Sequence, residues 1–109
     1  MKIDVVNVRR HGWLGVQYVG RGSGSVLGNP FVIGKDGDRE KVIQLYRIWL
    51  CCEVERGLKG KGCEVWDELV RLCGLVKEGR DVKLGCWCSP EPCHGEVVKS
   101  CVLLLTETK

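Results

Sequence analysis

Apolar residues recur at two different periods along the chain and divide it into strands and helices. The β-branched segment 3–9 alternates partly between apolar and polar residues, which predicts a first strand. Residues 16–19 predict a second short strand that returns beside the first as a hairpin. Residues 81–87 predict a third strand, which leads into a motif rich in cysteine.

Three further segments carry apolar residues at a spacing of three and four, which indicates amphipathic helices. The first follows Asp38, a good N-cap residue, and runs to about Glu55, with Gly57 and Gly60 ending it. The second stops near Gly79, and the third follows Pro92, which suits the first turn of a helix. The stripes are Val42, Leu45, Tyr46, Trp49 and Leu50; Trp66, Leu69, Val70, Cys73 and Val76; and Val97, Val98, Cys101, Leu104 and Leu105.

This order of elements predicts an α/β fold, a small sheet with about three helices that forms a single compact domain over residues 1–109. The last strand, loop and helix place the segment from Cys86 to His94 at the C-terminal edge of a strand. Ligand sites of open α/β sheets gather at that edge. The sequence therefore predicts that this segment contains the functional site of the domain.

Length and charge narrow the class of protein. The chain of 109 residues has room for one hydrophobic core, and no apolar run approaches the roughly 20 residues of a membrane-spanning helix. The first residues lack the apolar stretch of a secretory signal, so we expect a cytoplasmic protein with no membrane partner. A net charge of +3 and a pI near 8.4 are only mildly basic, whereas dedicated duplex-binding domains usually exceed a pI of about 9.

Eight cysteines are many for a cytosolic chain of this size. In that compartment they indicate metal binding or catalysis, except in hyperthermophiles, whose intracellular proteins also use disulfides. The scarcity of Asn, Gln and Met agrees with a thermophile. The five cysteines outside the densest motif are expected to be structural: Cys73 and Cys101 on helical stripes, Cys51-Cys52 at a helix end, and Cys63 in a loop where it could pair with another thiol.

The segment with the most closely spaced cysteines, residues 86–94, could form a metal site. Cys86, Cys88, Cys93 and His94 lie within nine positions and are the nitrogen and sulfur ligands that zinc prefers. The spacing between the first two departs from the Cys-x2–4-Cys of familiar zinc sites. Three of the four residues could also bind zinc together with an outside ligand.

Two other interpretations of the same motif stay open. Cys93 would lie in the first turn of the last helix, where the helix dipole favours a thiolate, with His94, His11 or Glu96 as its acid or base. Alternatively, Cys86 and Cys88 are buried small apolar residues at the end of a strand.

Two more features could contact a ligand. The glycine-rich segment 20–31, which includes Gly28 and Asn29, could present backbone N–H groups to an anion, although it does not match a phosphate-binding loop and could be a plain surface loop. Trp13 and Trp87 lie beside these segments and could stack on a base, with packing in the core as the expected alternative.

The chain resembles the family numbered 4326 among domains of unknown function, which is found in bacteria, phages and archaeal viruses. The resemblance spans nearly the whole chain and implies that two of its motifs matter, without implying a reaction. Ser23-Gly24-Ser25 looks like an insertion relative to the family pattern. The residues that carry the resemblance are Val5-Val6-Asn7-Val8-Arg9-Arg10, Tyr18-Val19-Gly20-Arg21, Leu27-Gly28-Asn29-Pro30-Phe31-Val32-Ile33-Gly34, Asp38-Arg39-Glu40, and Cys86-Trp87-Cys88-Ser89-Pro90 followed by Pro92-Cys93-His94-Gly95.

The leading hypothesis is a cleft between the Gly-Asn-Pro-Phe loop and the cysteine motif that holds a nucleotide or a modified base. Arg9, Arg10 and Arg21 would meet its phosphate, Gly28 and Asn29 would contact the ligand, and the cysteine motif would bind a metal such as Zn or supply the chemistry. The rival hypothesis is a non-catalytic module whose cysteines stabilise the fold and whose surface binds nucleic acid or a protein partner.

Overall fold

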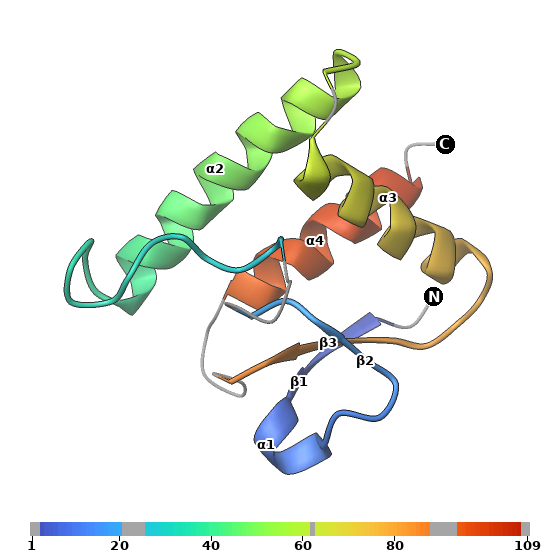
Figure 1. The fold of residues 1–109 in the computed structure, drawn as a ribbon, viewed down its shortest axis with the longest axis horizontal. Coiled ribbons are helices and arrows are strands. Elements are labelled where there is room, and N and C mark those ends of the chain that lie inside the picture. The colour runs from blue at the N-terminus through green and yellow to red at the C-terminus, as the bar shows by residue number, and fades with distance from the viewer. Residues whose placement is uncertain (1–2, 21–25, 62, 88–93, 108–109) are drawn as a thin grey trace.

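The computed structural model describes residues 3–20, 26–61, 63–87 and 94–107. They form a mixed α/β domain with a three-stranded sheet and four helices (Figure 1). The elements are β1 (Ile3–Asn7), α1 (Val8–His11), β2 (Val16–Tyr18), α2 (Arg39–Leu58), α3 (Glu64–Lys77), β3 (Val82–Cys86) and α4 (His94–Glu107). The predicted α/β class is confirmed.

The sheet is fully parallel, with the strand order β1-β3-β2. The predicted hairpin between the first two strands is therefore wrong, because β3 lies between them. Residues 8–15 return the chain toward the amino end of the sheet. Strand β2 therefore starts beside Lys83 and runs in the same direction as β1. In this register Asn7 is opposite Cys86 and Tyr18 is opposite Gly85, so all three strands end at one edge.

The first strand is shorter than the sequence predicted, because its last residue caps a helix. The side chain of Asn7 accepts a hydrogen bond from the backbone N–H of Arg9 at 2.8 Å, which starts the one-turn helix α1 at Val8. Gly12, with φ of +88°, follows this helix and returns its N–H to the carbonyl of Val8. The segment 8–11 was predicted as the end of a strand and a break, and α1 was missed.

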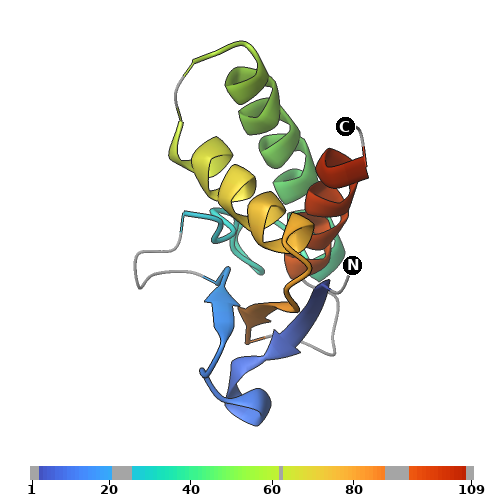
Figure 2. The same ribbon diagram turned by 90° about the vertical axis from the view of Figure 1, so that its right-hand side faces the viewer.

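The three long helices cover one face of the sheet, and α1 lies on the opposite side (Figures 1 and 2). Asp38 caps α2 as predicted and accepts from the backbone N–H of Lys41 at 2.8 Å. Cys63 caps α3, since its Sγ accepts from the N–H of Trp66 at 3.2 Å. Cys63, for which pairing with another thiol was one option, is a free cysteine with a capping role.

Helices α2 and α3 approach closely at a glycine. Gly57 was expected to lie beyond the end of the first long helix, but it lies inside α2, which continues to Leu58. A Cβ atom at this position would overlap the ring of Trp66 on α3. The helix continues because glycine, despite its low helix propensity, is the residue that fits under this indole.

The main core lies between the sheet and the three long helices. Val82, Leu84 and Cys86 point into it from the central strand. The cluster comprises Ile3, Val19, Leu27, Tyr46, Leu50, Val65, Leu69, Leu72, Cys73, Val76, Val82, Leu84, Val97, Val98 and Val102. None of the helices among the described residues is long and apolar enough to cross a membrane.

The other face of the sheet is thinner and is built around Gly85. A Cβ atom there would overlap the side chains of Val8 and Val16, so α1 and the start of β2 close directly over the central strand. Strand alternation places Tyr18, Lys83 and Gly85 on this outer face. On the outer face, the edge at which the three strands end is therefore formed by α1, the end of β2 and the residue after β3.

Candidate ligand-binding site

An exposed aromatic cluster occupies the carboxyl-end edge of the sheet. It comprises Trp13 from the loop before β2, Tyr18 at the end of β2 and Trp87 directly after β3. The ring centroids of Trp13 and Tyr18 are 5.1 Å apart, and those of Trp13 and Trp87 are 5.8 Å apart. Trp13 is 53% exposed and Trp87 is 50% exposed, so the expected packing of both indoles in the core is wrong.

A hydrogen bond fixes Trp87 on Tyr18 within the aromatic cluster. The indole Nε1–H of Trp87 donates to the hydroxyl of Tyr18 at 2.9 Å. The Tyr18 ring lies over Gly20, where a Cβ atom would overlap it. An indole that is fixed at its N–H is already ordered before a ligand arrives, so stacking on it costs less entropy.

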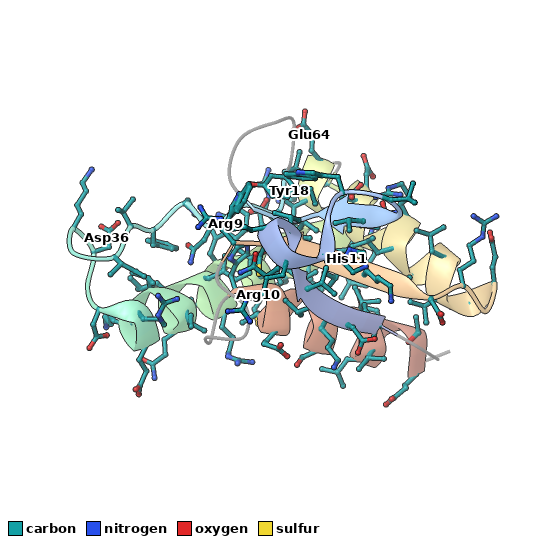
Figure 3. All side chains as sticks on the ribbon, turned by 90° about the horizontal axis from the view of Figure 1, so that it is seen from below. Arg9, Arg10, His11, Tyr18, Asp36 and Glu64 are labelled. Carbon is teal, nitrogen blue, oxygen red and sulfur yellow. The ribbon has the colours of Figure 1, made fainter. Side chains whose placement is uncertain are left out.

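The predicted phosphate-binding arginines adjoin this cluster. Arg9 and Arg10 are exposed on α1, next to His11, and α1 contains no acidic residue. Figure 3 shows Arg9, Arg10, His11 and Tyr18 in the same region of the molecule, seen from the outer face. Arg21, the third predicted arginine, lies outside the described residues.

Asn7 connects the basic helix to the aromatic cluster. Its Oδ1 accepts from the N–H of Arg9, and its Nδ2 donates to the carbonyl of Trp87 at 3.2 Å. The start of α1 is thus tied to the residue that follows the central strand. The sequence contained a signal for this role, because Asn at the end of a strand is a preferred N-cap residue, but it was interpreted as part of the strand.

Asn29 is buried and anchors its own loop. Its Oδ1 accepts from the N–H of Phe31 at 2.9 Å, across Pro30, and its Nδ2 donates to the carbonyl of Val42 in α2 at 3.3 Å. These bonds support a structural role in fixing the Gly-Asn-Pro-Phe turn on α2. Contact of Gly28 and Asn29 with a ligand stays a prediction.

Two residues of the cysteine motif are described, and both are buried. Cys86 is 1% exposed and closes β3 on the side of the long helices, and His94 is 8% exposed at the first position of α4. Cys88 and Cys93 lie outside the described residues. No cluster of three or more metal-ligating side chains occurs within the part of the chain that the structure describes.

His94 is held by its distal ring nitrogen. Nε2 lies 2.5 Å from the carbonyl oxygen of Val19, just past β2, and the imidazole packs edge to face on Tyr46 with centroids 4.9 Å apart. A carbonyl oxygen only accepts, so Nε2 carries the proton in this hydrogen bond. Tyr46 is itself fixed, since its hydroxyl donates to the carbonyl of Leu27 at 2.8 Å.

The remaining thiols differ in their access to water. Burial, together with the neighbouring Cys73 and Cys51, raises the pKa of Cys101 to about 11. Burial also raises the pKa of Cys73, partly offset by Lys77. These two thiols are therefore poor nucleophiles at neutral pH, which agrees with their predicted structural roles on α3 and α4.

A hollow lies along the first half of α2, away from the aromatic cluster. It encloses about 510 Å³ and is lined, among the described residues, by Arg39, Glu40, Ile43, Gln44 and Arg47. Two arginines beside one carboxylate leave this hollow with an excess of positive charge. It differs from the aromatic cluster in offering no aromatic side chain among its described lining.

A comparison with family models matches residues 5–103 to the domain of unknown function DUF4326. This chain belongs to that family. The match runs from within β1 to within α4, so the aromatic cluster, α1 and the cysteine motif all lie within the family domain. No curated protein and no solved structure matches the chain.

Proposed function

We propose that this DUF4326 domain binds a nucleotide-like ligand at the carboxyl-end edge of its sheet. The observation that carries the proposal is the aromatic cluster, in which two half-exposed indoles, one of them (Trp87) fixed by a hydrogen bond, share the edge with two exposed arginines. Aromatic faces stack on bases, and guanidinium groups pair with phosphate. The edge is also where ligands bind in parallel α/β sheets.

The charge of the edge supports an anionic ligand. Arg9 and Arg10 are side by side on α1, and the tie from Asn7 to the Trp87 carbonyl sets the position of α1 relative to the indoles. Base and phosphate groups on one ligand could thus be engaged together. The mild net charge of +3 for the whole chain is consistent with a local basic site rather than a basic surface.

Tryptophan fluorescence provides the test. Titration with AMP, GMP, CMP and UMP at low salt should quench the emission, and Trp87→Ala should remove most of the quenching. Ile48→Ala, which removes an exposed apolar side chain from α2, is the matched control and should bind as the native chain does. Arg9→Gln should weaken binding, whereas Arg80→Gln, at the amino end of β3, should leave it unchanged.

Two outcomes would overturn this proposal. The first is native quenching that survives Trp87→Ala and Trp13→Ala together. The second is loss of binding in Arg47→Gln with full binding in Arg9→Gln, which would move the site to the hollow on α2.

A second candidate function is metal binding by the cysteine motif, and the position of His94 favours it. Metal-ligating histidines commonly donate their other ring N–H to a backbone carbonyl, as Nε2 of His94 does to Val19. Cys86, Cys88, Cys93 and Nδ1 of His94 would be the ligands, and their thiolate and imidazole donors suit Zn. When bound, zinc would stabilise the fold or polarise a substrate group.

Metal analysis of protein purified without added metal tests this candidate. About one equivalent of zinc, lost together with thermal stability in Cys86→Ser, is the expected result. The control is Cys52→Ser, an exposed thiol on α2, which should keep its metal. Less than about a tenth of an equivalent, with melting unchanged by a chelator, would contradict it.

A further inference from the structure

The two exposed indoles of the aromatic cluster are nearly perpendicular. The planes of Trp13 and Trp87 meet at 71° with their centroids 5.8 Å apart, and each indole is about half exposed. A base is planar and stacks face to face, so one base can lie flat on only one of these rings. The cluster thus offers two stacking surfaces that face different directions.

We propose that the ligand is a single-stranded nucleic acid, with two neighbouring bases splayed apart on Trp13 and Trp87 and their phosphates on α1. This inference rests on the proposed function, because it concerns the same cluster and the same arginines. It adds that the ligand is a strand of at least two nucleotides rather than a free nucleotide.

The angle between the rings selects for an unstacked strand. In a duplex each base face is covered by its neighbours, and adjacent bases are parallel, so neither indole could reach a base face. A single strand opens at small cost and exposes these faces to protein aromatics. Leu14, which is 92% exposed beside Trp13, extends the apolar surface on which a splayed base would rest.

The arginines are arranged for more than one phosphate. Arg9 and Arg10 are consecutive on a helix, so their side chains leave its axis about 100° apart. In Figure 3 the two labelled side chains leave α1 in different directions. A single phosphate would meet one of them more readily than both, whereas a strand passing α1 presents phosphates in succession.

The affinity expected for one stacked base also favours a strand over a free nucleotide as the ligand. One base stacked on an open aromatic face strengthens binding by about 5- to 150-fold, which by itself corresponds to a dissociation constant in the millimolar range or weaker. Two stacked bases and two phosphate contacts together lower the dissociation constant below that of a single stacked base. We expect a ten-nucleotide strand to bind at least about tenfold more tightly than a mononucleotide.

Fluorescence anisotropy with labelled ten-nucleotide strands of oligo-dT and oligo-U tests the inference, with a ten-base-pair duplex and UMP as competitors. The native chain should bind the single strands, with the duplex and UMP competing weakly. Trp13→Ala and Trp87→Ala should each lower the affinity by about 5- to 150-fold, and Trp87→Phe should restore part of it. Ile48→Ala is again the matched control.

Salt dependence gives a readout that does not depend on the tryptophans. Two phosphate contacts predict a slope of about −1.4 in log K against log salt, and Arg9→Gln or Arg10→Gln should each reduce its magnitude by about 0.7. Arg80→Gln should leave the slope unchanged. These charge variants lie on the surface, so they keep the inference testable if an indole variant does not fold.

The outcomes separate the two proposals. Equal affinity for UMP and the ten-nucleotide strand would overturn the single-strand inference and leave the nucleotide site standing. Tighter binding to the duplex would also overturn it. Absence of binding to nucleotides and strands alike would overturn both, and so would binding of the Trp13–Leu14 loop to anionic phosphatidylserine vesicles in place of nucleic acid.

Discussion

The side-chain amide of Asn7 donates a hydrogen bond to the backbone carbonyl of Trp87, a residue 80 positions away. The same side chain caps α1 by accepting from the N–H of Arg9. One residue at the end of β1 therefore positions both the basic helix and the residue after the central strand. This arrangement explains how a short one-turn helix, which would not form by itself, has a fixed place beside the aromatic cluster.

Substitutions at Asn7 should separate its two roles. Asn7→Ser keeps a capping oxygen but loses the amide donor, so it should weaken ligand binding while costing little stability. Asn7→Ala loses both and should lower the free energy of unfolding by about 1 kcal/mol. Urea unfolding and nucleotide titration of the two variants measure the difference. Equal stability of Asn7→Ala and the native chain would show that the cap contributes nothing.

The Tyr18 ring provides a second test at the site. Gly20→Ala places a methyl group where the ring lies, so the ring must move and the Trp87 indole loses its acceptor. We expect ligand binding to weaken several-fold, with a smaller loss in Tyr18→Phe, which removes only the hydroxyl group. Intrinsic fluorescence titration reports both. Full binding by Gly20→Ala would mean that the orientation of Trp87 does not matter.

Two glycines of the long helices form a matched pair. Gly57 in α2 lies under the ring of Trp66, whereas a Cβ atom at Gly74 in α3 would meet nothing within 4 Å. Gly74→Ala should stabilise the protein by about 0.5–1 kcal/mol through helix propensity. Gly57→Ala should destabilise it by about 1–3 kcal/mol through overpacking. Thermal unfolding measures both changes, and a stabilising Gly57→Ala would contradict the close approach of α2 and α3.

Alkaline pH should destabilise the fold through Cys101. Its pKa rises from an ordinary value of 9.0 to about 11 on folding, mainly because the thiol is buried. The folded state keeps its proton while the unfolded state loses it, so the contribution to stability is complete below pH 9 and is lost as the pH rises toward 11. Denaturant unfolding of the native chain and of Cys101→Val across this range should show a steeper loss in the native chain. Parallel pH profiles would contradict the assignment.

Local sequence patterns correctly predicted the helices, because helix periodicity and capping depend on residues that are close together in the chain. The three-four spacing predicted α2, α3 and α4, and Asp38 predicted a helix start that the structure confirms. Gly79, with φ of +84°, follows α3 where glycine favours a helix end. The alternation of strands and helices also predicted the α/β class, because each element has one apolar face to bury.

Relationships between distant segments could not be predicted in the same way. The predicted hairpin is wrong because strand order depends on where β3 inserts into the sheet, and its Lys83 pairs with Val16 of β2 across 67 positions of sequence. The exposure of Trp13 and Trp87 was missed, since tryptophan is usually buried and only the fold reveals that these two meet at the surface. The bond from His94 to Val19 likewise joins elements that are far apart in the chain.

The indole N–H resonances of the four tryptophans test the central claim most directly. Trp13 and Trp87 belong to the aromatic cluster, whereas Trp49 and Trp66 lie on α2 and α3 and serve as internal controls. Addition of a short oligo-U strand should shift the Trp13 and Trp87 signals in a two-dimensional NMR spectrum and leave those of Trp49 and Trp66 in place. Unchanged Trp13 and Trp87 signals at millimolar ligand, or shifts confined to Trp49 and Trp66, would contradict a nucleotide-binding site at this edge of the sheet.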